Sequence, residues 1–111
     1  MPAHRNIVTP GFEAVTRHKS ESLNVALAGE LDMMAAFKLE PALEDLLAAH
    51  DVRRLVLDLA DLTFIDSAGL GALLAIRDRT QGLGIEMVLA NVSGPARRIL
   101  ELSGLGPILL D

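Results

Sequence analysis

Apolar residues change their spacing several times along this chain, and each spacing predicts a different element. Leu23, Val25 and Leu27 alternate with polar or small residues, which is typical of a strand with one large apolar face. A second extended stretch, residues 12–17, precedes it across a polar link of hairpin length. The pattern therefore predicts two neighbouring antiparallel strands, at 12–17 and 23–28.

A leucine pattern with helical spacing follows, and it predicts an amphipathic helix that ends near His50. Pro41 interrupts it, because a proline ring removes a backbone donor and clashes with the preceding turn, at about 3 kcal/mol in a helix interior. Two solutions are open: a short turn over 34–39 before a helix that starts at Pro41, or one kinked helix. The continuous stripe favours the kinked helix. Its leucines are Leu39, Leu43, Leu46 and Leu47.

The second half of the chain alternates apolar runs with helical patterns. A strand is expected over residues 53–59, because residues 55–59 are almost continuously apolar, as in a strand covered on both faces. Helical spacing over 67–81 follows and ends at glycines, and residues 85–90 read as another strand. A turn with a capping serine and a proline then opens a third helix through Leu102, whereas 105–111 is too short to assign.

This order of elements predicts an α/β fold. We expect a small mixed sheet of about four strands, with an antiparallel N-terminal hairpin followed by right-handed β-α-β units, flanked by helices. Residues 1–11 combine two prolines with polar residues and little periodicity, so we expect a flexible N-terminal arm there.

Composition narrows the function. A chain of 111 residues, half of them apolar, is most simply one domain. It has no cysteine, which excludes disulfides and thiol chemistry, and its net charge of -5 with 3% aromatic residues argues against nucleic-acid binding. The sequence contains neither a long apolar run nor an apolar signal-peptide core, so we expect a cytoplasmic protein without direct membrane insertion.

The junction between the strand at 53–59 and the helix at 67–81 carries the candidate chemistry. Ser67 is expected to be the N-cap or in the first turn of that helix, and Asp32, Asp66 and Ser67 should meet at the carboxyl ends of adjacent parallel strands. Asp and Ser are ordinary capping residues, so a purely structural role is one reading. Phosphorylation of Ser67 is the other, since it would add about -1.5 to -2 charges beside the carboxylates.

Other kinds of site fit less well. A serine-hydrolase elbow would need a glycine where Ile65 stands and a histidine after Ser67, yet all three histidines precede it. The glycine spacing matches neither a P-loop nor a dinucleotide loop. Two neighbouring carboxylates are too few for a dedicated calcium site, so we expect no metal and no cofactor.

Four motifs together give the chain a resemblance to the STAS domain, and within it to the bacterial anti-sigma-factor antagonists. The resemblance runs from about residue 12 to residue 105, and it implies a STAS domain over residues 12–111. The motifs are Gly29-Glu30-Leu31-Asp32, the run from Leu55 through Phe64-Ile65-Asp66-Ser67-Ala68-Gly69-Leu70, Asn91-Val92-Ser93, and Leu102-Ser103-Gly104-Leu105.

The resemblance implies a partner-switching regulator of transcription that is not an enzyme. The unphosphorylated protein would bind an anti-sigma factor with serine-kinase activity and release a sigma factor. Phosphorylation of Ser67 would end the association, and a PP2C-type phosphatase would restore the binding form. The implied partner-binding residues are Asp32, Met33, Met34, Asp66, Ser67 and Gly69.

Several alternatives stay open. The chain could instead be a STAS subunit of a membrane transporter complex, such as a lipid-transport ATPase, acting as a structural contact. Met33 and Met34 could form an adaptable contact surface or plug the edge of the core. Thr63 is either a second phosphorylation site or a β-branched residue at a strand end. The oligomeric state is not fixed by the sequence.

Overall fold

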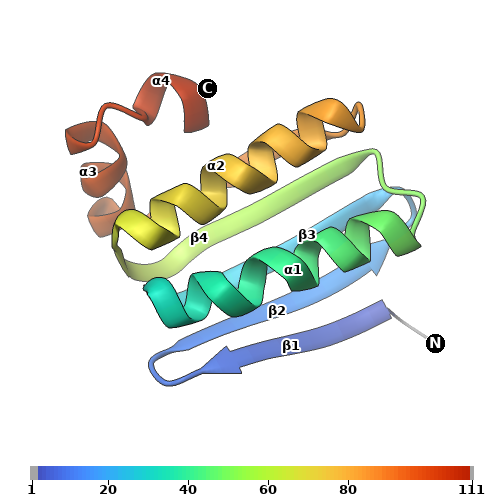
Figure 1. The fold of residues 1–111 in the computed structure, drawn as a ribbon, viewed down its shortest axis with the longest axis horizontal. Helices are drawn as coiled ribbons and strands as arrows, with labels where there is room; N and C mark the ends of the chain where they lie inside the picture. Colours follow the sequence, from blue (N-terminus) through green and yellow to red (C-terminus); the bar gives the residue numbers. More distant parts are fainter. Residues whose placement is uncertain (1–2, 111) are drawn as a thin grey trace.

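A computed structural model describes residues 3–110 and contains, within that range, one five-stranded sheet in the order β1-β2-β3-β4-β5. Two long helices, α1 and α2, lie side by side on one face of this sheet (Figure 1). The elements are β1 (Ala3–Thr9), β2 (Phe12–Lys19), β3 (Ser22–Leu31), α1 (Met33–Ala49), β4 (Arg54–Ile65), α2 (Ser67–Gly82), β5 (Glu86–Ala90), α3 (Gly94–Leu102) and α4 (Gly106–Leu109).

The topology confirms the predicted α/β class. Strands β2 and β3 pair antiparallel, whereas β3 with β4 and β4 with β5 pair parallel. Parallel neighbours need a crossover connection, and α1 and α2 supply the two crossovers. The antiparallel hairpin followed by parallel units is therefore as predicted.

The flexible arm predicted for residues 1–11 is wrong where the structure describes it, because Ala3–Thr9 forms the edge strand β1. This strand pairs with β2 from Ala3 opposite His18 to Thr9 opposite Phe12. Pro10 and Gly11 form the connection, with Gly11 at a φ of +79°, where glycine is favoured. Ile7 is buried but Val8 is exposed, so an edge strand held mainly by its backbone leaves a weak hydrophobic pattern. Met1 and Pro2 lie outside the described residues.

Strand β4 differs from its prediction in its length and in how many of its faces are buried. It runs on to Ile65, six residues beyond the predicted end, and its pairing with β3 shifts register between Ala26 and Ala28 and again between Gly29 and Glu30. These irregularities break the alternation from which a strand is predicted.

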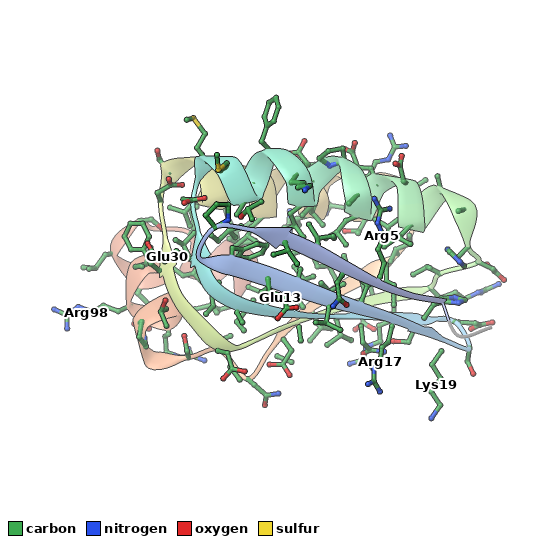
Figure 2. All side chains as sticks on the ribbon, turned by 90° about the horizontal axis from the view of Figure 1, so that it is seen from below. Arg5, Glu13, Arg17, Lys19, Glu30 and Arg98 are labelled. Carbon is green, nitrogen blue, oxygen red and sulfur yellow. The ribbon has the colours of Figure 1, made fainter. Side chains whose placement is uncertain are left out.

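Nor is β4 covered on both faces. Leu55, Leu57 and Leu59 are buried, but Val56 and Asp58 between them are only half-buried. Figure 2 shows both long helices on one side of the sheet, with Glu13 and Arg17 on the other. The apolar run reflects a core on one side and a partly open surface on the other.

Helix α1 is a single helix that contains Pro41, which confirms the one-helix alternative. Pro41 is exposed, while residues on both sides of it bury their side chains against the sheet and α2, so the packed face continues past the proline. None of the helices between residues 3 and 110 is both long and apolar enough to cross a bilayer. The buried residues of α1 are Ala35, Ala36, Leu39, Ala42, Leu43 and Leu47.

Candidate functional site

The ends of β3 and β4 bring the starts of α1 and α2 together. Leu31 and Ile65 are register partners at the last pairing of the two parallel strands, and the backbone amide of Asp66 donates to the carbonyl oxygen of Leu31 at 3.2 Å. Asp32 and Asp66 each follow directly and act as the N-caps of α1 and α2. The predicted meeting of Asp32, Asp66 and Ser67 is therefore confirmed.

The carboxylate of Asp66 connects the two helices. Its Oδ1 accepts a hydrogen bond from the backbone amide of Gly69 at 2.8 Å, which caps α2. Its Oδ2 accepts from the backbone amide of Met33 at 3.1 Å, in the first turn of α1. Asp32 makes the more local bond, in which Oδ1 accepts from the amide of Ala35 at 2.9 Å. Both acids thus have a structural role, and Asp66 fixes one helix start against the other.

Ser67 is the first residue of α2 and is exposed. Since Asp66 is the N-cap, the first-turn interpretation of Ser67 is correct and the N-cap interpretation is not. The hydroxyl therefore lies at the positive end of a helix of 16 residues, where backbone amides favour a negative group. An exposed hydroxyl in this position can be reached by another protein.

Gly69 lets α2 approach β3 closely. A Cβ atom at this position would collide with the carbonyl oxygen of Leu31 and would lie 2.9 Å from Cγ2 of Ile65. Gly69 is buried, and its amide is the one that Asp66 caps. In this structure Gly69 positions Asp66 and Ser67, and its contact with a partner stays a prediction.

Met33 and Met34 are 69% and 60% exposed, so they do not plug the edge of the core. The interpretation as a contact surface remains. Phe37, one turn further along α1, is 86% exposed, and Phe64 beside the site is 44% exposed. The sequence pattern did not predict that either phenylalanine is exposed. The available signal was that Phe37 falls outside the leucine stripe that predicts the buried face of α1.

Thr63 has a structural partner. Its hydroxyl donates to the carbonyl oxygen of Gly29 at 3.1 Å and so bridges β4 to β3 near the irregular pairing, although the residue is exposed. The structure thus gives it a role at the strand end, and its phosphorylation stays a prediction.

The histidines whose side chains the structure describes lie away from Ser67. His50 is the C-cap of α1, about 25 Å from its start at 1.5 Å per residue, and its ring centroid lies 4.5 Å from that of His18. Among the side chains that the structure describes, no three His, Asp or Glu are grouped so that they could hold a metal ion. The site consists of the exposed residue Ser67, the helix-capping acids Asp66 and Asp32 at the ends of the paired strands, and exposed apolar side chains nearby.

Comparison with known proteins connects this site to a family. The model of the STAS domain matches residues 13–110. An anti-sigma F factor antagonist from Paenibacillus polymyxa is 33% identical over 92 residues, which are 83% of this chain and 79% of the relative.

Two solved structures share the fold. The anti-sigma factor antagonist SpoIIAA in its unphosphorylated form has a TM-score of 0.73 at 24% identity, over 98% of this chain and 87% of the other. A sulfate transporter family protein from Wolinella succinogenes has a TM-score of 0.72 at 19% identity, over 82% and 73% of the two chains. At these identities the two structures share a fold and nothing further follows from them.

Proposed function

The chain belongs to the STAS domain family, and we propose that it is an anti-sigma-factor antagonist that works by partner switching. Unphosphorylated, it binds an anti-sigma factor that is also a serine kinase, so that a sigma factor is released. The kinase transfers a phosphoryl group from ATP to the hydroxyl of Ser67, and a PP2C-type phosphatase removes it. The chain itself is a substrate and a binding protein in the cytoplasm, and it catalyses no reaction.

The exposed hydroxyl of Ser67 beside two carboxylates is the observation that supports this proposal most directly. A phosphate there adds about -1.5 to -2 charges. A partner surface that fits the hydroxyl, Asp32 and Asp66 would then meet a bulky group of the same sign as the acids. Like-charge contacts at an interface cost several kcal/mol, which is enough to end an ordinary association.

The same position explains why phosphorylation can change binding without unfolding the chain. Ser67 is in the first turn of α2, where a negative group is stabilised by the helix dipole by about 0.3 to 1 kcal/mol. The bonds that hold the site come from Asp66 and not from the serine side chain. The modification therefore changes the surface and leaves the scaffold in place.

The test is intact-mass measurement after incubation with ATP and the anti-sigma factor kinase encoded in the same genome. We expect one phosphate on the wild-type chain and none on Ser67→Ala. Thr63→Ala is the matched control, because Thr63 is a second exposed hydroxyl near the same strand end, and we expect it to accept one phosphate as the wild type does. Phosphate that persists on Ser67→Ala would contradict the assignment.

The alternative, a structural subunit of a membrane transporter complex, has less support. It rests on a shared fold at 19% identity, whereas the relative named as an antagonist is 33% identical over most of the chain. Affinity purification separates the two functions: a GHKL-type kinase among the bound proteins supports the antagonist, and a transporter ATPase supports the alternative.

A further inference from the structure

Helix α1 begins with apolar side chains that face solvent. Met33, Met34 and Phe37 are 69%, 60% and 86% exposed, and across from them Val8 of β1 and Pro10 of the β1–β2 connection are exposed as well. We call these five residues the α1 patch. A sulfur-bearing side chain and an aromatic ring stand clear of the first turns of α1 in Figure 2.

The patch contains a shallow groove of about 340 Å³ between α1 and the end of β1. Phe37 and Met34 form one wall, and Val8 and Pro10 form the other. Nothing in the fold of the described residues explains these side chains, because α1 packs on the sheet and α2 through its opposite face. Grouped exposed apolar residues mark interaction sites more often than single ones do, and methionine and aromatic residues are enriched at interfaces. Thr9 and Lys38 also line the groove.

The α1 patch is continuous with the phosphorylation site. The backbone amide of Met33, a patch residue, donates a hydrogen bond to the carboxylate of Asp66 at 3.1 Å. Ser67 directly follows Asp66 in the sequence. In Figure 1 the β1–β2 connection and the first turns of α1 and α2 all lie at the same end of the molecule. A protein that covers Ser67 therefore has the groove within reach of the same interface.

The charges around the patch indicate the chemistry of its occupant. Asp32 and Asp66 border it on one side, and Lys38 borders it on the other, with Nζ 3.4 Å from the carbonyl oxygen of Val8. An anionic lipid surface would be repelled by the carboxylates. A protein segment that inserts an apolar side chain into the groove and places a basic residue opposite the two acids matches both features.

We propose that the α1 patch is the phosphorylation-independent part of the docking surface for the anti-sigma factor kinase, and that an apolar side chain of the kinase fills the groove beside Phe37. This inference rests on the proposed function. The interface then has two parts: Ser67 with its acids, whose charge changes, and the patch, whose apolar contacts are the same in both states. The patch holds the kinase while the hydroxyl is presented to it, so it acts on substrate binding and not on phosphoryl transfer.

The test is titration calorimetry of the full chain with the purified anti-sigma factor kinase, together with the kinetics of Ser67 phosphorylation. Removing a buried phenylalanine contact weakens binding by roughly tenfold to a hundredfold, so we expect that loss in the affinity of Phe37→Ser. We expect KM to rise by a similar factor with kcat unchanged. Leu102→Ser is the matched control, because Leu102 is 78% exposed on α3 and outside the patch, and its affinity should stay within about twofold of the wild type.

The outcomes separate the patch from the proposed function. Kinase affinity of Phe37→Ser equal to that of the wild type, with Ser67→Glu weakened, overturns the patch and leaves the function standing. A wild-type chain that neither binds the kinase nor is phosphorylated at Ser67 overturns the function itself. A wild-type dimer in sedimentation velocity that Phe37→Ser dissociates, without a change in kinase affinity, assigns the patch to a second copy of the chain and overturns the inference.

Discussion

The carboxylate of Asp66, the N-cap of α2, accepts a hydrogen bond of 3.1 Å from the backbone amide of Met33, the first residue of α1. The same carboxylate accepts a hydrogen bond of 2.8 Å from the backbone amide of Gly69 in the first turn of α2. One side chain therefore satisfies amide groups at the starts of two helices, groups that a helix cannot satisfy internally. The relative position of the Ser67 hydroxyl and the α1 patch depends on this residue.

Replacement of Asp66 should destabilise the fold more than replacement of Asp32. Loss of an N-cap costs about 0.5 to 2 kcal/mol, so we expect about 1 kcal/mol for Asp32→Ala, which removes the single bond to Ala35. Asp66→Ala removes two bonds, and we expect about 1 to 3 kcal/mol. Urea unfolding followed by circular dichroism measures both. Equal midpoints for the two variants would show that the bond between the helices contributes nothing.

Two glycines of α2 should respond in opposite directions to the same substitution. Gly69→Ala places a methyl group against the carbonyl oxygen of Leu31, and overpacking of this kind costs about 1 to 3 kcal/mol. Gly71→Ala meets no atom within 4 Å and restricts the unfolded chain, so we expect a gain of about 0.5 to 1 kcal/mol. Thermal unfolding of the pair provides the comparison. A Gly69→Ala protein as stable as the wild type would mean that α2 can move away from β3.

The core elements were predictable because the spacing of their apolar residues follows the period of the strand or helix that they form. Leu23, Val25 and Leu27 are all buried, as their alternation requires, and the leucines of α1 face the sheet and α2 past Pro41. The meeting of Asp32 and Asp66 followed from the rule that parallel strands end at the same edge. The spacing of apolar residues indicates which face of a strand or helix is buried, and the positions of these core elements depend on little else.

Features set by contacts between distant segments were not predictable in the same way. Strand β1 has Ile7 as a buried anchor and otherwise depends on backbone pairing with β2, which no spacing of residues reveals. Whether Asp66 or Ser67 caps α2 depends on the extended backbone of Asp66, at φ -92° and ψ -176°, since both residue types cap helices. The grouping of Phe37 with Val8 and Pro10 is a tertiary property, because these residues come from segments that lie far apart in the sequence.

Strand β1 provides a direct test of the corrected N-terminus. Ile7 is buried between β1 and the core, so Ile7→Ala should lower the free energy of unfolding by about 2 to 4 kcal/mol. Its neighbour Val8 is 53% exposed, and Val8→Ala should change stability by less than about 0.5 kcal/mol. Urea denaturation measures the free energy of unfolding of both variants and of the wild type. If Ile7→Ala is as stable as the wild type, residues 3–9 behave as the loose arm that the sequence predicted.

A negative charge at position 67 should separate binding from folding. Ser67→Glu places a carboxylate in the first turn of α2, where the helix dipole tolerates it, so the free energy of unfolding should change by less than about 0.5 kcal/mol. Its charge beside Asp32 and Asp66 should weaken kinase binding by at least about tenfold, whereas Ser67→Ala should bind as the wild type does. Thr63→Glu is the control for charge at a neighbouring exposed hydroxyl, and a smaller loss is expected there because Thr63 lies on β4 and not at the helix start. Calorimetric titration with the kinase measures all four proteins. Equal affinities for Ser67→Glu and Ser67→Ala would mean that charge at this hydroxyl does not control which partner binds.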